Sequence, residues 1–191
     1  MTAPRRTFAG LLAFVVISNP VCAQEALSRA VELPGHRALL RTMGGIESPS
    51  PFATDGCSGG MSSAWQVVSR NFPDFAEAHG DIPPWEACCV THDRAYHDAS
   101  GATTAEASYD ARKAADITLR ACVKATAETD RDAIAEHYKT TPEAIDEAYA
   151  LIATAMFTAV RLGGGPCTGL PWRWGYGYPG CIAGPGDFGS E

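Results

Sequence analysis

CCVTHDRAY, residues 88–96, is the most informative stretch of this sequence. Read as a helix, it places Cys88, His92 and Tyr96 four residues apart, and therefore on one face. Asp93 lies about 100° further round the helix, beside Cys89 one turn earlier. Two adjacent sulfurs can thus fix the start of the helix while an imidazole and a carboxylate face the same general side. Histidine is the side chain most easily poised as a base near neutral pH, and aspartate can hold a hard cation.

The N-terminal segment has the pattern of a signal peptide rather than of a folded element. A basic start precedes an apolar run over 8–17, which is too short to span a bilayer. Small residues at Val21 and Ala23 predict cleavage after Ala23. We therefore expect a signal peptide over 1–23 and a single domain over 24–191, in a periplasm or outside the cell.

Charge and cysteine content limit the possible functions. Removing Arg5 and Arg6 from the 15 basic residues leaves 13 against 22 acidic ones, a formal charge of −9. This charge argues against nucleic acid as a partner and against electrostatic attraction to anionic lipid. An even number of cysteines remains, which predicts disulfides in an oxidising compartment, although spacing alone leaves the pairing open. The remaining cysteines are Cys57, Cys88, Cys89, Cys122, Cys167 and Cys181.

The apolar pattern predicts a mainly α fold stapled by disulfides. The expected elements are one or two short helices over 24–45 broken at Pro34-Gly35, short helix and loop over 61–84, the central helix over 85–99, and helices over 103–125, 128–139 and 142–163. Thr103 with Glu106 three residues later is a capping-box pattern. Thr141-Pro142-Glu143 supplies an N-cap, an N1 proline and a first-turn acid.

A second informative stretch is TDGCSGG, residues 54–60. Three glycines surround Cys57 in this stretch. Glycines let backbone carbonyls and amides turn inward, as a cation or an oxyanion site requires.

DGCSGG at 55–60 followed by CCVTHDRAY at 88–96 resembles the active-site region of secreted phospholipases A2. The family pattern is two cysteines, two residues, His-Asp, and then Tyr three residues after the Asp, and all of these are present. The long separation of loop and helix, and the glycine–cysteine tail, are more similar to group XII and prokaryotic members. The resemblance is specific for 55–60 and 85–122 and looser for 142–181. It implies two antiparallel active-site helices and a calcium loop.

The resemblance implies hydrolysis of the sn-2 ester of phospholipids at a membrane or micelle interface, by a calcium-dependent monomer. His92 would be the general base that takes a proton from the attacking water. Tyr96 would hydrogen-bond the carboxylate that orients His92. Ala95 stands where the family usually has a further cysteine.

The resemblance also implies the Ca²⁺ ligands. Asp93 would bind the ion through its carboxylate, and the loop would complete the shell. The N–H of Ser58 would be the donor to the developing oxyanion. The loop ligands would be the Asp55 carboxylate and the carbonyls of Gly56, Ser58 and Gly60, with Gly56 in place of the family's tyrosine.

In the family, the first cysteine of the pair bridges to the antiparallel helix, which implies Cys88–Cys122, Cys57–Cys89 and Cys167–Cys181. Given that pairing, the orienting carboxylate can be chosen. Cys88 lies about 6 Å along the helix before His92, while Asp116 lies about 9 Å and Asp110 about 18 Å before Cys122. Only Asp116 can then face His92, and its spacing to the cysteine is the family's own.

Two alternatives use other chemistry. GCSGG matches the nucleophile elbow of serine hydrolases, with Ser58 as the nucleophile and Asp116 and His137 later in the chain. That motif must follow a buried strand, which the proline-rich stretch before it does not provide. Zinc bound by Cys88, Cys89 and His92 would require a reducing compartment.

A third alternative is a catalytically weak lipid- or protein-binding module on the same scaffold. The aromatic tail would suit a membrane interface, or would pack over its own disulfide loop. Its aromatic residues are Trp172, Trp174, Tyr176 and Tyr178. The histidines outside the motif are expected to be exposed, and these are His36, His79, His97 and His137.

Overall fold

The structure, a computed structural model, describes residues 20–57, 62–80 and 82–189. The described residues form helices and loops with no β-strand, which confirms the mainly α expectation. The elements are α1 (Pro20–Gly44), α2 (Ser62–Asn71), α3 (Pro73–Ala78), α4 (Glu86–His97), the short 3₁₀ turn η2 (Ala99–Gly101), α5 (Ala105–His137), α6 (Pro142–Gly163) and the 3₁₀ turn η3 (Pro185–Asp187). Most of the expected signal peptide, and the loop residues Ser58 and Gly60, lie outside these ranges. Among the described helices, none is both long and apolar enough to cross a membrane.

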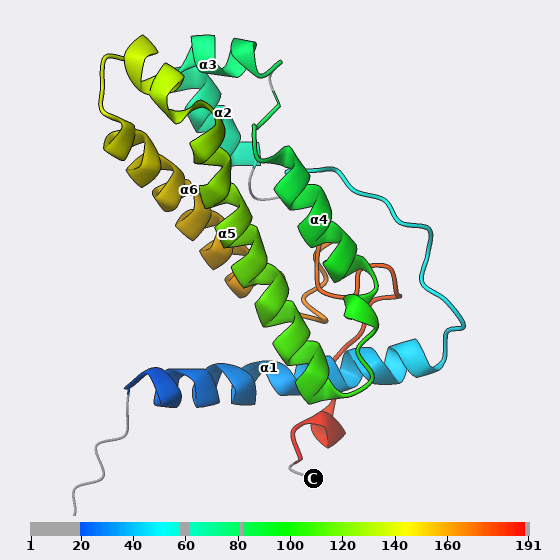
Figure 1. Cartoon of the computed structure of the whole chain (residues 1–191). Coiled ribbons are helices and arrows are strands. Elements are labelled where there is room, and N and C mark those ends of the chain that lie inside the picture. The colour runs from blue at the N-terminus through cyan, green and yellow to red at the C-terminus, as the bar shows by residue number, and fades with distance from the viewer. Residues whose placement is uncertain (1–19, 58–61, 81, 190–191) are drawn as a thin grey trace, which may run out of the picture.

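Three helices form the body of the molecule. α5 and α6 run antiparallel and side by side, and α4 lies along the other side of α5 (Figure 1). α1 crosses one end of this group, near the start of α5, and η3 packs on it. α2 and α3 cover the opposite end (Figure 1).

The larger core cluster fills the space between α4, α5 and α6. Apolar residues recur every three or four positions on α5 and α6, so each helix presents one continuous apolar face. Burial of each large side chain contributes about 1.5–3 kcal/mol. The main members are Trp85, Leu119, Val123, Tyr149, Met156 and Val160. A second cluster, made by Leu39, Tyr96, Ala99 and Trp174, joins α1 and the tail to α4.

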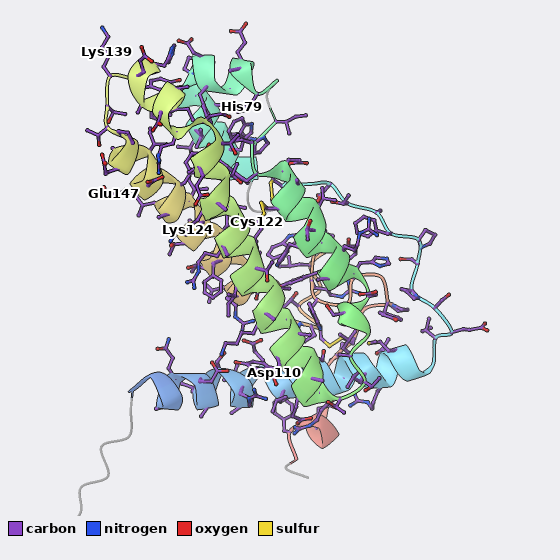
Figure 2. The ribbon with its side chains drawn as sticks, in the orientation of Figure 1. His79, Asp110, Cys122, Lys124, Lys139 and Glu147 are labelled. Carbon is purple, nitrogen blue, oxygen red and sulfur yellow. A yellow bond between two sulfur atoms is a disulfide. The ribbon has the colours of Figure 1, made fainter. Side chains whose placement is uncertain are left out.

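Three disulfides form with the pairing that the resemblance implied. Cys57–Cys89 ties the glycine-rich loop to α4, Cys88–Cys122 ties α4 to α5, and Cys167–Cys181 closes the tail. Figure 2 shows Cys122 on the side of α5 that faces α4. The two adjacent sulfurs therefore attach the same end of α4 to two different neighbours.

The expected break at Pro34-Gly35 is wrong, because α1 continues through Pro34 as one helix. A proline inside a helix costs about 3 kcal/mol through a lost hydrogen bond and a steric clash. Pro34, His36, Ala38 and Leu39 are all buried, and α1 packs against α5. The burial of this turn offsets the local cost of the proline.

The expected division of α5 is also wrong. One helix runs from Ala105 to His137, and its N-cap is Thr104, whose hydroxyl accepts from the Ala107 N–H at 3.1 Å. The capping box expected at Thr103 therefore does not form. The segment 105–137 contains no glycine or proline, and Ala127 and Ala135 are buried while the acidic residues between them are mostly exposed. The charged run is the outer face of a continuous helix.

The aromatic residues of the tail are buried or half-buried rather than exposed to solvent. Trp174 has no exposed surface, and its indole N–H donates to the Ser108 hydroxyl at 2.9 Å. The membrane-interface role considered for Trp174 is therefore wrong. The other aromatic residues of the tail, Trp172, Tyr176 and Tyr178, are half-buried.

Two histidines expected at the surface are buried. The Nδ1 atom of His36 lies 2.8 Å from the Ser108 hydroxyl, and its ring meets Tyr109 edge-on. His97 packs edge-on against Tyr176. The sequence expectation failed because α5 covers His36 and the tail covers His97, and neither position carries a local apolar pattern. His137 is exposed, as expected, and His79 is half-buried.

Candidate active site

His92 and Tyr96 lie one turn apart on the face of α4 that meets α5, and both are buried. The Nε2 atom of His92 lies 2.9 Å from Oδ1 of Asp116, and the Tyr96 hydroxyl donates to the same oxygen at 2.6 Å. Asp116 comes from the middle of α5 and has no exposed surface. The structure thus brings together the three residues that the sequence placed in the catalytic group.

The contact with Asp116 determines which nitrogen of His92 is free. An ionised carboxylate can only accept hydrogen bonds, so the proton of the neutral imidazole sits on Nε2. Nδ1 is then the acceptor, and it lies 4.0 Å from Oδ1 of Asp93. A buried carboxylate thus holds the Nε2 edge of the imidazole, and the other nitrogen, Nδ1, is available as a base.

Asp110, the competing carboxylate, lies far from this group. It is exposed at the end of α5 that lies near α1 (Figure 2), and it pairs with Arg29 of α1. The helix register set by Cys88–Cys122 therefore directs Asp116 to His92 and Asp110 to solvent.

Tyr96 is fixed from three sides. Its ring lies 4.1 Å from the His92 ring and 4.9 Å from the Trp174 ring, measured between centroids. Gly164 packs so closely that a Cβ there would lie 2.8 Å from Cε1 of Tyr96. Burial, together with the neighbouring Asp116 carboxylate, raises the pKa of Tyr96 well above its ordinary value. Tyr96 therefore stays protonated and acts as a hydrogen-bond donor.

The described part of the glycine-rich loop lies over Asp93. The Thr54 hydroxyl donates to Oδ2 of Asp93 at 2.6 Å and accepts from the Gly56 N–H at 2.9 Å. Asp55 is exposed beside this contact. No sequence pattern singles out Thr54, because a lone threonine before an Asp-Gly turn is common.

Asp93 is a half-buried carboxylate with other acidic residues near it. Burial raises the pKa of Asp93, the negative charges of Asp55 and Glu86 add to that rise, and the Thr54 hydrogen bond opposes it. Several carboxylates therefore share a small region. A bound cation would relieve this repulsion.

Gly56 occupies a position whose backbone conformation favours glycine. Its φ is +67°, and a Cβ there would lie 1.6 Å from Oε1 of Glu86. Glu86, in the first turn of α4, accepts from the Cys57 N–H at 3.1 Å. A side chain at position 56 would therefore displace the Glu86 carboxylate from this contact.

The tail holds the loop from the other side, which the sequence did not reveal. The Tyr176 hydroxyl donates to the Ala53 carbonyl at 2.7 Å, and the Ser50 N–H donates to the Gly177 carbonyl at 2.8 Å. Burial, followed by the negative charges of Asp93 and Asp55, raises the pKa of Tyr176 to about 12. Tyr176 therefore stays protonated and uncharged beside Asp93.

The donor chemistry here fits a hard cation. Within the described residues, no cluster of three or more histidine, cysteine or carboxylate side chains could hold a metal. A Ca²⁺ site built from a carboxylate and loop carbonyls needs no such cluster. Asp93, Asp55 and the Gly56 carbonyl supply hard oxygen atoms, while Ser58 and Gly60 lie outside the described residues. Zinc bound by Cys88 and Cys89 is excluded, because both sulfurs are in disulfides.

A cavity of about 360 Å³ lies between α4 and α5, with His92 in its wall. Its lining is mostly small or apolar, so an apolar chain could lie beside the imidazole. The other lining residues are Cys88, Thr91, Ala95, Ser100, Ala111, Ala114, Ala115, Thr118, Leu119 and Cys122.

His137, the histidine of the serine-hydrolase alternative, does not pair with Asp116. His137, at the C-terminal end of α5, lies 3.4 Å from Asp74 of α3, whereas Asp116 is occupied by His92. The assembled group is an imidazole between two carboxylates, which can remove a proton from a water molecule at Nδ1. No family model, curated protein or solved structure matches the chain.

Proposed function

We propose that this protein is a calcium-dependent phospholipase A2 that hydrolyses the sn-2 ester of phospholipids, with the fold of the secreted family. The observation that carries the proposal is the imidazole of His92, with Asp116 on Nε2 and Asp93 toward Nδ1. The loop tied to α4 by Cys57–Cys89 supports it, because this loop brings oxygen donors beside Asp93.

The chemistry follows from these positions. His92 takes a proton from a water molecule at Nδ1 while the water oxygen attacks the ester carbonyl. Asp116 stabilises the imidazolium that forms, and Tyr96 holds the carboxylate in place. His92 then returns the proton to the departing glycerol oxygen as the ester C–O bond breaks. The products are a fatty acid and a lysophospholipid.

The site would be completed by the loop. When bound by Asp93, Asp55 and the carbonyls of Gly56, Ser58 and Gly60, Ca²⁺ would polarise the ester carbonyl and hold the substrate phosphate. The Ser58 N–H would donate to the developing oxyanion. The cavity beside His92 would take an acyl chain. The disulfides and the signal-like N-terminus support export to a periplasm or the medium.

The proposal is tested with vesicles of a phosphatidylcholine whose two acyl chains differ. Mass spectrometry of the products identifies the ester that is cut, in Ca²⁺, in EGTA, and in Ca²⁺ after treatment with a serine-directed inhibitor. We expect release of the sn-2 chain alone, only with Ca²⁺, and without inhibition.

Other outcomes would contradict the proposal and indicate what replaces it. Release that persists in EGTA and stops with the inhibitor would favour a serine hydrolase using Ser58. Calcium binding by a folded protein without hydrolysis would favour a binding module.

A further inference from the structure

The second oxygen of Asp116 is bound by an arginine that the proposed mechanism does not use. Oδ1 already accepts from His92 and Tyr96, while Oδ2 accepts from Nη1 of Arg161 at 3.0 Å. Arg161 lies in the last turn of α6, and its side chain is only 15% exposed. The carboxylate is thus held at both oxygens, by residues from two helices.

Arg161 is itself held by the N-terminal helix. Its Nη2 atom donates to Oε1 of Glu32 at 2.5 Å, so one guanidinium spans two carboxylates. The planar fork of arginine suits this arrangement, because its nitrogens point in fixed directions. Glu32 lies on α1, 129 residues away from Arg161 in the chain.

A second arginine completes the network. Arg112, which has no exposed surface, donates to the other oxygen of Glu32. It also donates to the carbonyls of Val160 at 2.7 Å and Arg161 at 2.9 Å, which fixes the end of α6. Two positive charges, the buried Arg112 and the mostly buried Arg161, therefore face the carboxylates of Glu32 and Asp116. The end of α6 cannot move without breaking several of these hydrogen bonds.

We propose that Arg161 is a positioning residue for the catalytic pair, and that Glu32 holds Arg161 in place. Arg161 occupies Oδ2, so the Asp116 carboxylate is kept from rotating and Oδ1 stays directed at His92. Removing Arg161 leaves a buried oxygen without its donor, which favours rotation of the carboxylate toward other donors. The inference rests on the proposed function for its kinetic consequence, but the geometry can be tested without activity.

The first test observes the hydrogen bond itself by ¹H–¹⁵N NMR of labelled protein. The wild type should show a slowly exchanging imidazole N–H of His92, assigned by its absence in His92→Gln. We expect this signal to broaden or disappear in Arg161→Met. It should remain in Arg120→Met, a matched control whose guanidinium lies over the Phe157 ring on the α5–α6 surface. An unchanged signal in folded Arg161→Met would overturn the inference.

The second test measures kinetics on a short-chain monomeric phospholipid, so that interface binding does not contribute. Arg161→Met should lower kcat about tenfold or more, with KM unchanged, because orientation of the base contributes mainly to the chemical step. Arg161→Lys should recover part of kcat through a single donor to Asp116. Equal losses in Arg161→Lys and Arg161→Met, or a kcat that does not change in Arg161→Met, would overturn the inference.

Two further readouts keep the inference falsifiable. If Arg161→Met does not fold, Glu32→Gln carries the NMR test, and an unchanged His92 signal there would overturn the role of Glu32. A purely structural role would lower the midpoint of thermal unfolding and leave the His92 signal intact. If the wild type does not hydrolyse phospholipid, the proposed function fails while the NMR result still decides the inference.

Discussion

Asp116 accepts hydrogen bonds from His92, Tyr96 and Arg161 while having no exposed surface. Asparagine at this position would direct an amide N–H group at side chains that are themselves hydrogen-bond donors. It would also favour the His92 tautomer that carries its proton on Nδ1 instead of Nε2. We expect Asp116→Asn to lower kcat on the order of 100-fold or more. Initial rates of sn-2 release measure this directly.

The control for that substitution is Asp110→Asn on the same helix. Asp110 is exposed and forms a surface ion pair with Arg29, so its loss should cost no more than about 1 kcal/mol of stability. Activity should be nearly unchanged. A severe effect of Asp110→Asn with a mild effect of Asp116→Asn would refute the helix register.

Asp93 should make calcium affinity sensitive to pH. Because burial raises its pKa, folded Asp93 takes up a proton at a higher pH than in the unfolded chain. Above the folded-state pKa, the ionised Asp93 carboxylate lowers the free energy of unfolding. This destabilisation is lost as the pH falls through the folded-state pKa. Protons should compete with Ca²⁺ at a higher pH than at an exposed aspartate. Calcium affinity should therefore fall as the pH is lowered. Calorimetric titration with Ca²⁺ at several acidic pH values measures the midpoint pH of this loss of affinity.

Thr54→Val tests the cause of that midpoint. The Thr54 hydroxyl stabilises the ionised form of Asp93, so its removal should move the midpoint of calcium affinity to higher pH. Thr91→Val, which removes an exposed hydroxyl bonded to the Ala87 carbonyl, should leave the midpoint in place. A downward shift in Thr54→Val would contradict the proposed role of Thr54.

The C-terminal end of α6 contacts α4 at Gly164, where the glycine lies against the Tyr96 ring. A Cβ at Gly164 would lie 2.7 Å from the Val160 carbonyl and 2.8 Å from Cε1 of Tyr96. We expect Gly164→Ala to destabilise the fold by about 1–3 kcal/mol. It should also lower kcat, because the Tyr96 ring must move away from Asp116. Urea unfolding and sn-2 release measure the two effects.

The neighbouring glycine provides the control. A Cβ at Gly165 would meet only Cγ2 of Thr168 at 3.6 Å, an ordinary contact. Gly165→Ala should change stability by about 0.5 kcal/mol or less. Equal effects of the two substitutions would contradict the close packing of Gly164 on Tyr96.

Helices with local signals could be predicted from the sequence, and helices stabilised by distant contacts could not. Thr141 and Pro142 begin α6 as expected, because capping depends on adjacent residues. Pro34 does not end α1, because packing against α5 and the tail stabilises the helix. The charged run after Ala125 does not end α5, because only its inner face must be apolar.

The molecule assembles its candidate site from the motif helix α4 and from segments that carry no motif. His92, Tyr96, Asp93 and Asp116 could be found, because the motif and the disulfide register fix them. Glu32, Trp174 and Tyr176 could not, since each reaches the site from α1 or the tail. Their contacts join residues far apart in the chain, and no short-range pattern reports such contacts.

The ends of the chain therefore support the central helices rather than forming separate functional units. α1 supplies Glu32 to the arginine network, and the tail supplies Trp174 behind Tyr96 and Tyr176 beside Asp93. Figure 1 shows how α1 and the tail meet at the same end of the helical body. Activity should consequently depend on the whole described chain and not on the motif helix alone.

The measurement that tests the central claim most directly is the initial rate of sn-2 fatty-acid release by the wild type and by His92→Gln, with His137→Gln as the control. Nδ1 of His92 is the proposed base, whereas His137 is exposed and pairs with Asp74. We predict a loss on the order of 100-fold or more in His92→Gln, with calcium affinity and thermal unfolding preserved, and no loss in His137→Gln. A His92→Gln variant that releases the sn-2 chain at the wild-type rate would contradict the proposed function.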